Sequence, residues 1–363
     1  MKKTFLIVFA LILGLAICSF ICINKKQNAD NEVVFWTLQM NDFAPYMNKV
    51  ISNFEKENPS VKINFIHIPQ NYFQKLHLLF ASNSAPDVLF INNLYLPIYA
   101  SYLDDLTTLV DKKDYYTQSL DSLSWNNKLL AIPRDVSNLI FYVNTDIVEY
   151  NEKWTMSDLL SIMQKITSDE VYAISFEEDI YWAFPYLAYF GEKFNEKFDY
   201  RTSKGFNFYK DLRDKYRVAP TKSQVGSSTQ AQMFLDKKIG IYLSGRWMYP
   251  KITEKADFNW NIVAFPLGKN PYPCDASGWA ISKKSKNKDL AIKFVKYLSD
   301  EKSSKYFAQT GLIVPARKDV SQLLNNLYHN EKVFLEVIDN SEKTYIPYNF
   351  KKLSDDFNNK AFN

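Results

Sequence analysis

FPLGKNPYPCDASGWAISKKSKNKDLAIKFVKYLSDEKSSKYFAQTGLIVP, residues 265–315, is the stretch that decides the fold of this chain. Three prolines between residues 266 and 273 interrupt its beginning, and each lacks an amide donor and fixes its own φ angle. We therefore expect an irregular crossing between two lobes, which ends before Gly278. The short run 279–282 after this glycine is typical of a buried strand.

Two helices are expected in the rest of this stretch. Apolar residues at three- and four-residue steps between Leu290 and Leu298 place one stripe against a sheet. The next helix, from about 301 to 309, ends where Gly311 can take the left-handed conformation, and Pro315 prevents it from resuming. The stretch thus predicts a crossing, a strand and two helices, with a further crossing after them.

Upstream, the sequence alternates strands with helices. This order predicts parallel pairing, and the ligands of such open sheets bind outside the carboxyl ends of the strands. We therefore expect a ligand site near residues 37–41, 69–72 and 92–95. The pattern consists of an apolar strand at 33–36, an amphipathic helix that ends at Asn58-Pro59, a strand at 61–68, a helix at 71–82 and a strand at 87–91.

The middle of the chain repeats this pattern, so a second α/β lobe is expected to begin near Asp135. Strands are predicted at 139–143, 171–175, 239–243 and 260–265, and residues 318–363 predict only helices. A length of 363 residues also fits two domains better than one. We expect crossings between the lobes near 133–136, 266–277 and 311–317, which gives lobe I as 32–133 plus 278–314 and lobe II as 134–277 plus 315–363.

The N-terminus carries a targeting signal, because Lys2 and Lys3 precede the uncharged residues 4–23. Residues 1–23 are either a cleaved signal or an uncleaved anchor, since this apolar segment is long enough to span a membrane. A third alternative is lipidation of Cys18, because residues 15–18 resemble a bacterial lipobox with Ile17 in place of the usual small residue. We expect an extracytoplasmic protein, in the periplasm or at the outer face of the cytoplasmic membrane, tethered to that membrane, with residues 24–31 as a spacer.

Composition narrows the class of partner. Aromatic residues make up 16% of the chain, which is more rings than a core needs and predicts that some line a ligand surface. The net charge of +4 comes from interspersed charges without a basic block, which argues against nucleic acid as a partner. Beyond the N-terminal segment Cys274 is the only cysteine, so we expect no intrachain disulfide.

The sequence lacks the usual signals for cofactors, metals and catalysis. The patterns GxGxxG, GxxxxGK[ST] and GxSxG do not occur, and His67, His77 and His329 are too scattered for metal-ligand spacing. We expect no cofactor, no metal site and no enzymatic activity. Paired carboxylates, as in a glycoside hydrolase, stay open as an alternative, because their separation in space does not show in a sequence.

Six parts of the chain carry a resemblance to a known family. They are VVFWT at 33–37, FEKENPSVKI at 54–63, SAPDVLFI at 84–91, NNKLLAIPRDVSNLIFYVNTDI at 126–147, FLDKKIGIYLSGRW at 234–247, and SGWAISKKSKNKDLAIKFVKYL at 277–298 followed by GLIVPAR at 311–317. Their order and intervals, over nearly all of the chain after Glu32, resemble the extracytoplasmic solute-binding proteins of ABC importers. The resemblance is to family 1, the sugar-binding group that includes the maltodextrin-binding proteins.

This resemblance implies a two-lobed, periplasmic-binding-protein-like α/β fold, in which each lobe is a mostly parallel sheet flanked by helices and the ligand cleft lies between the lobes. It implies a monomeric component that captures a mono- or oligosaccharide and delivers it to the membrane permease by hinge closure. Two alternatives stay open. One is a glycerophosphoester ligand, which Arg134 and Arg246 would suit, and the other is a membrane-tethered sensory module.

Aromatic candidates for the cleft are Trp247, Trp279, Trp182 and Tyr186, because a ring can cover the apolar C–H face of a sugar. Trp247 ends the SGRW segment after an apolar strand, and the resemblance implies that the family's stacking Trp lies here. Trp182 and Tyr186 are one helical turn apart and would form a third wall. Core packing is the alternative for each ring, above all for Trp279.

Polar candidates follow the predicted strand ends, because sugar hydroxyls need directed donors and acceptors. A cap or turn role is the alternative for the amides, and Arg134 beside Asp135 would neutralise that carboxylate. The candidates are Gln39, Asn41, Tyr72, Asn92, Asn93, Asp135 and Arg246.

Overall fold

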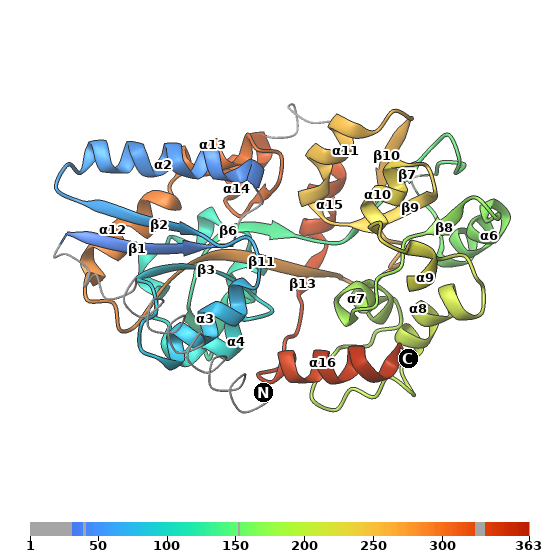
Figure 1. Ribbon diagram of the computed structural model, residues 1–363, viewed down its shortest axis with the longest axis horizontal. Coiled ribbons are helices and arrows are strands. Elements are labelled where there is room, and N and C mark those ends of the chain that lie inside the picture. The colour runs from blue at the N-terminus through green and yellow to red at the C-terminus, as the bar shows by residue number, and fades with distance from the viewer. Residues whose placement is uncertain (1–30, 39–40, 152, 324–330, 363) are drawn as a thin grey trace, which may run out of the picture.

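The computed structural model describes residues 31–38, 41–151, 153–323 and 331–362. Its strands form two main sheets that lie side by side, with helices packed around each (Figure 1). The first sheet has the order β12 (Val314–Pro315), β6 (Ile132–Ser137), β11 (Tyr272–Ile281), β3 (Val88–Asn92), β1 (Glu32–Thr37) and β2 (Lys62–His67), and β13 (Ser341–Lys343) also pairs with β11. The second has the order β10 (Trp260–Val263), β7 (Ile140–Asn144), β9 (Ile239–Ser244) and β8 (Tyr172–Ile174).

The helices follow the apolar periodicity of the sequence. In α6 (Met156–Ile166), Leu159 and Met163 are buried, and Thr155 and Asp158 form a reciprocal capping box at its start. The other helices of eight or more residues are α2 (Ala44–Glu57), α3 (Tyr72–Ala81), α7 (Ile180–Tyr189), α8 (Lys204–Asp214), α12 (Lys288–Leu298), α13 (Glu301–Ala308), α15 (Glu331–Asp339) and α16 (Phe350–Ala361).

Shorter helical turns connect these elements. They are η1 (Asn41–Phe43), α4 (Leu96–Tyr99), η2 (Ala100–Tyr102), η3 (Thr107–Leu109), η4 (Lys112–Asp114), α5 (Thr117–Ser122), α9 (Lys222–Val225), α10 (Gln230–Leu235), η5 (Arg246–Met248), α11 (Tyr249–Lys255) and α14 (Lys318–Ser321). A small hairpin of β4 (Ser124–Trp125) and β5 (Lys128–Leu129) also lies before β6.

The first sheet begins with the predicted parallel pairing. β1 pairs in parallel with β2 and β3, because α2 and α3 return the chain between successive strands. Figure 1 shows α2 and α13 along one face of this sheet and α3 and α4 along the other. In the core between this sheet and its helices, the ring of Phe35 lies 5.4 Å from that of Trp279 and 5.3 Å from that of Phe294. The predicted strand–helix order of this half is therefore confirmed.

The second sheet does not have the predicted parallel pairing. Only β8 and β9 pair in parallel there, whereas β7 pairs antiparallel with both β9 and β10. The reason is the route of the chain: β7 follows β6 after a two-residue link, without a helical crossover, and enters between strands that run the other way. The α/β class of the lobe is confirmed, and the prediction of a mostly parallel sheet is wrong for it. The first sheet is mixed as well, because β11 pairs antiparallel with β3 and β6, and β12 pairs antiparallel with β6.

The predicted irregular crossing at 266–277 is also wrong in its second half, because β11 already begins at Tyr272. In Figure 1 this strand extends from the first sheet toward the second, beside β6. Pro273 is compatible with this strand because the backbone hydrogen bonds to the β13 segment are made by its neighbours Tyr272 and Cys274, so its missing amide is not needed. The Pro273 carbonyl accepts a bond from the Asn138 side chain at 2.6 Å. Two continuous strands therefore connect the lobes.

The exact division of the chain into lobes stays a prediction. The expected boundaries after residues 133 and 277 fall inside β6 and β11. In the C-terminal part, α16 packs on the second core, where the ring of Phe357 lies 4.6 Å from that of Phe206. Val320 of α14, by contrast, packs against Ala308 of α13 in the first lobe.

The N-terminal predictions lie outside the described residues, and these include Cys18 and the apolar segment 4–23. No helix in the described part of the chain is both long enough and apolar enough to cross a membrane.

Candidate ligand-binding cleft

A cavity of about 820 Å³, called the cleft below, is lined by residues of both lobes. The first lobe contributes the end of β3 and the loop after it, and the second lobe contributes α7 and the turn after β9. Between these walls lie residues 134–137 of β6 and 275–277 of β11, which form the cleft floor. The cleft therefore lies at the carboxyl end of β3, as predicted for a sheet of this kind.

Trp247 lies in the cleft wall of the second lobe. It belongs to η5, directly after β9, and its partly buried ring packs against Gly245 so closely that a Cβ there would come within 2.0 Å of it. The Tyr142 hydroxyl donates to the Gly245 carbonyl at 2.9 Å, which fixes the turn. The structure thus places this ring where a ligand can reach it, and its stacking role stays a prediction.

Arg246 precedes this ring and also lines the cleft, although it is buried. Its guanidinium lies 4.1 Å from the centre of the Tyr249 ring and 4.8 Å from that of Phe334. Aromatic faces attract a cation through their quadrupole, so these rings hold the charge in the wall.

Asp135 lies on the cleft floor in a network of its own. Arg134 donates from Nε to its carboxylate at 2.6 Å, and Ser277 donates from Oγ at 2.8 Å. The Arg134 guanidinium also stacks within 5.0 Å of the Phe43 ring centre and 5.1 Å of that of Phe90. The arrangement supports the structural alternative for Asp135, because its partners already neutralise the carboxylate.

Asn92 and Asn93 end β3 at the opposite wall. Asn92 lines the cleft and accepts a bond from the Tyr95 amide at 3.2 Å, as a turn former does. Asn93 is 3% exposed and donates from Nδ2 to Asp275 at 2.8 Å. Asp275 was not among the candidate site residues predicted from the sequence, because it lies in the proline-containing stretch that was predicted to be an irregular crossing. Burial raises the pKa of this carboxyl, although the bond from Asn93 opposes the shift.

Helix α7 contributes Tyr181 to the cleft in place of the predicted Trp182 and Tyr186. Tyr186 is 1% exposed and packs 4.8 Å from the Phe265 ring, and Trp182 does not line the cleft. The prediction that these two rings form a wall is wrong, because the shared helical face is the core face. Tyr181 is one residue before Trp182, about 100° around the helix, and the nearly all-apolar sequence of α7 gave no signal for this face.

Trp279 and Tyr72 are also core residues. Trp279 is 0% exposed in the middle of β11, and Tyr72 is 2% exposed and donates to the Phe90 carbonyl at 2.8 Å. The assignment of Trp279 to the ligand site is wrong, because its side chain is enclosed in the first core. Tyr72 does not line the cleft but lines the second cavity described below, and its role stays a prediction. Gln39 and the side chain of Asn41 lie outside the described residues.

A second cavity, of about 890 Å³, lies next to the cleft and shares Leu38 with it. It is lined by α3, α4 and α16, and so also by both lobes. The rings of Phe73 and Tyr95 stack in its wall with centres 3.6 Å apart, and the exposed side chains of Leu78 and Tyr348 border it.

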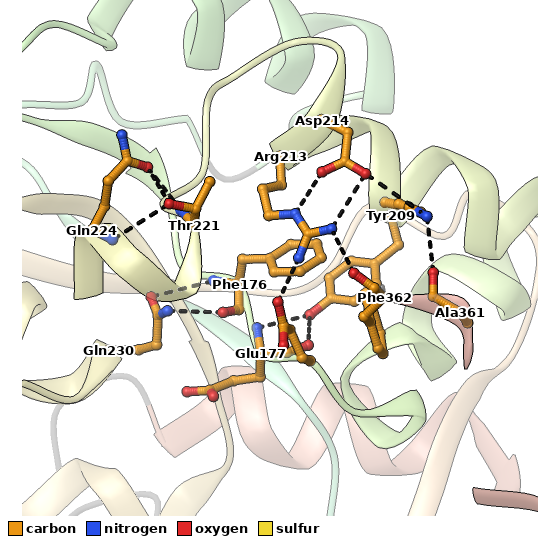
Figure 2. Close-up of polar contacts among 12 residues, drawn as sticks. Phe176, Glu177, Tyr209, Arg213, Asp214, Thr221, Gln224, Gln230, Ala361 and Phe362 are labelled. Atoms are coloured by element: carbon orange, nitrogen blue, oxygen red, sulfur yellow. Dashed lines mark hydrogen bonds and ion pairs between the residues drawn. The ribbon is translucent and has the colours of Figure 1, made fainter. Parts of the chain in front are cut away.

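A polar network fixes the loop before α7 to the end of the chain (Figure 2). Arg213 donates to Glu178 at 2.6 Å and to the Phe362 carbonyl at 3.4 Å, and its guanidinium lies 4.9 Å from the Phe176 ring centre. Asp179 caps α7 and accepts a bond from Asn358 of α16 at 2.6 Å. The start of α7, and with it Tyr181, is held by the C-terminal helix.

Within the described ranges, no group of three or more His, Cys, Asp or Glu side chains is arranged to hold a metal ion. The groups that line the cleft are amides, hydroxyls, rings, two guanidiniums and the carboxylates of Asp42, Asp135 and Asp275. Such groups bind an uncharged polar solute through hydrogen bonds and apolar contact.

A two-lobed α/β fold with a polar and aromatic cleft between its lobes defines a solute-binding protein. Residues 49–333 match the model of the family described as bacterial extracellular solute-binding protein. The match covers more than half of the chain, so the chain belongs to this family and is an extracytoplasmic protein.

Individual relatives agree with this assignment. The chain is 27% identical to the maltodextrin-binding protein MdxE of Bacillus subtilis, over 90% of this chain and 84% of that protein. The ABC substrate-binding protein Lmo0181 of Listeria monocytogenes, in complex with cycloalternan, has the same fold with a TM-score of 0.80 at 22% identity, over 90% and 92% of the two chains. The GacH receptor of Streptomyces glaucescens gives a TM-score of 0.79 at 22% identity, over 92% of each chain.

Proposed function

We propose that this protein captures a carbohydrate outside the cytoplasmic membrane and delivers it to an ABC permease. The observation that carries the proposal is the cleft itself, in which the partly buried Trp247 lies in one wall and the amides of Asn92 and Asn93 lie in the other. A sugar offers an apolar C–H face and a rim of hydroxyls, so it matches a ring and directed polar groups at once. Two similar proteins support the same class of ligand: one is named a maltodextrin-binding protein, and the other was solved in complex with cycloalternan.

The two walls belong to different lobes, so a bound sugar bridges them and favours the closed arrangement. The strands β6 and β11 and the segment 311–317 connect the lobes, and bending within them is the expected hinge motion. The sugar leaves unchanged in this mechanism, because no step breaks a bond.

A thermal-shift screen tests the proposal. Its panel contains maltose, maltotriose, a cyclic glucose oligosaccharide, a galactose oligosaccharide and glycerophosphocholine. A ligand that binds only the folded state raises the melting temperature, by an amount that grows with its concentration over Kd. We expect a rise with at least one sugar and full recovery of that sugar by chromatography. A rise with glycerophosphocholine alone would favour the phosphoester alternative, and hydrolysis of the sugar would show an enzyme.

Closure predicts a smaller radius of gyration for the protein with sugar than without it, because the lobes move together. Small-angle scattering at saturating concentration of the sugar that binds most tightly in the panel measures this change. The same data give the mass in solution, for which we expect a monomer. An unchanged radius at saturation would contradict hinge closure.

We also propose that the protein is tethered to the membrane, on the basis of the uncharged segment 4–23 and of Cys18. Fractionation of cells should place the full-length product with membranes. Labelling of growing cells with a fatty acid separates the two kinds of anchor, because a lipoprotein takes up the label and a Cys18→Ser variant of it does not, whereas an uncleaved helix carries no label in either form. A wild-type product found entirely in the soluble fraction would rule out both.

A further inference from the structure

Asp275 lies on the cleft floor at the point where β11 passes from one lobe to the other. It pairs in register with Ser137 of β6, and its side chain lines the cleft together with Asn93 and Tyr181. Asn93 follows β3 in the first lobe, and Tyr181 is on α7 of the second. One carboxylate on a connecting strand is therefore next to a polar group from each wall.

The Asn93 amide is fixed by β11 on both of its polar atoms. Its Nδ2 donates to Asp275 at 2.8 Å, and its Oδ1 accepts from the Ala276 amide at 3.3 Å. The backbone of Asn93 also donates to the Ala276 carbonyl at 3.0 Å. These contacts determine which end of the amide is nitrogen. An Nδ2 group carries two protons, so one remains to donate to a ligand.

Tyr181, on α7 of the second lobe, lines the cleft together with this carboxylate. It borders, with Asp275, a narrow crevice beneath the cleft, and burial together with the charge of Asp275 raises the pKa of its phenol. A phenol that donates its proton to a carboxylate leaves its oxygen lone pairs as acceptors. Tyr181 then accepts a hydrogen bond from a ligand, whereas Asn93 donates one.

We propose that Asp275 is a positioning residue, which sets Asn93 as a donor and Tyr181 as an acceptor on opposite sides of the cleft floor and so selects two adjacent hydroxyl groups on the ligand. One hydroxyl donates to the Tyr181 oxygen, and its neighbour accepts from Asn93 Nδ2. This inference rests on the proposed function, since a pair of adjacent hydroxyls is the feature that most sugars present. Beyond the proposed function, the inference names Asp275 as the residue that determines the direction of the two hydrogen bonds between the ligand and Tyr181 and Asn93.

The test uses Asp275→Asn, Tyr181→Phe and the double variant, titrated by calorimetry with the sugar that binds most tightly in the thermal-shift panel. An amide at 275 no longer accepts from both neighbours, so we expect each single change to weaken binding by roughly tenfold or more. The double variant should bind about as weakly as Asp275→Asn alone, because Asp275 acts through Tyr181 as well as through Asn93. Additive losses would show that the two side chains act separately and would overturn the proposal.

Asp146→Asn is the matched control. Asp146 also accepts a bond from an asparagine, Asn259 Nδ2, at 2.8 Å, but it lies outside the cleft. We expect its affinity to stay within about twofold of wild type. Should Asp275→Asn fail to fold, Tyr181→Phe alone decides, since unchanged affinity in that variant contradicts the acceptor role.

Analogues of the same sugar that lack single hydroxyls provide a second readout. Wild type should lose affinity for the analogues without either of the two adjacent hydroxyls, and Asp275→Asn should lose this discrimination; a purely structural role of Asp275 would leave it unchanged. If wild type binds no sugar of the panel, the proposed function fails and this inference fails with it. If wild type binds and Asp275→Asn binds and discriminates equally well, the inference alone fails.

Discussion

Trp247 and Trp279 follow glycines in similar sequence contexts, yet they lie in different environments. Trp279 is 0% exposed and pairs in register with Phe90 of β3 and Ile132 of β6, so it lies in the middle of the first sheet. Trp247 lies beyond the end of β9, in a turn that lines the cleft. The position relative to the end of a strand, rather than the residue type, separates the core ring from the cleft ring.

The two glycines show the same difference. A Cβ on Gly278 would come within 2.2 Å of the Ile132 carbonyl oxygen, where the register of β11 against β6 shifts, so this glycine permits a close approach inside the sheet. Gly245 instead makes room for the Trp247 ring itself. A glycine before a tryptophan therefore marks a bulge in one case and a turn in the other.

Replacing Trp279 tests the buried side of the comparison and has the largest expected effect. Trp279→Ala should lower the free energy of unfolding by about 3–5 kcal/mol, because it leaves a cavity in a packed core. Urea denaturation measures this loss. Trp279→Phe is the control, expected to cost less, because it retains a ring and because the Trp279 Nε1 has no hydrogen-bond partner among the described residues. A loss of sugar affinity with unchanged stability would place this ring in the ligand site after all.

Replacing Trp247 tests the cleft side. Trp247→Ala should weaken sugar binding roughly tenfold or more, because it removes a ring whose stacking is worth about 1 kcal/mol beyond its area. Its unfolding free energy should change less than that of Trp279→Ala. Calorimetry and denaturation of the same sample measure both quantities, and Trp247→Phe should recover part of the affinity. A large fall in stability with unchanged affinity would refute the stacking role.

The comparison of position with residue type extends to two adjacent acids. Glu178 accepts a bond from Arg213, whereas burial, with Asp179 nearby, raises the pKa of Glu177 from 4.5 to about 7. A carboxyl with a higher pKa in the folded protein than in the unfolded chain binds its proton more tightly when folded. Its contribution to stability is therefore largest below the unfolded pKa and is lost as pH rises through the folded one.

Glu177→Gln should remove this pH dependence, which amounts to roughly 3 kcal/mol between about pH 4.5 and 7. Melting temperatures of wild type and variant across this range measure it, and wild type should lose stability relative to the variant as pH rises. Glu178→Gln is the control, which loses the Arg213 contact and should be less stable than wild type at neutral pH. Parallel pH curves for wild type and Glu177→Gln would contradict the assignment.

Local patterns predicted the order of elements well, because helix caps and apolar periodicity act over a few residues. The predicted helices 71–82 and 301–309 match α3 and α13 closely. The direction of β7 was not predictable in this way, because it depends on which strands it joins in space. The prediction that Pro273 lies in an irregular segment was wrong for a related reason. A proline is excluded from a strand only where its missing amide faces a partner strand, and the tertiary fold determines which side that is.

The candidate site was predictable where a residue follows a strand and was missed where it depends on the far side of a helix. Trp247, Asn92 and Asn93 follow β9 and β3, and all three line the cleft. For α7 the sequence is apolar nearly all round, so its spacing did not show which face meets the core. The cleft side proved to be that of Tyr181.

A crystal structure of the protein with the sugar that binds most tightly in the panel tests the central claim most directly. The account predicts that this sugar occupies the cleft, with one ring over the indole of Trp247 and two adjacent hydroxyls at Asn93 and Tyr181. A sugar bound elsewhere would contradict it. One such place is the cavity of about 230 Å³ between the end of α7 and β13.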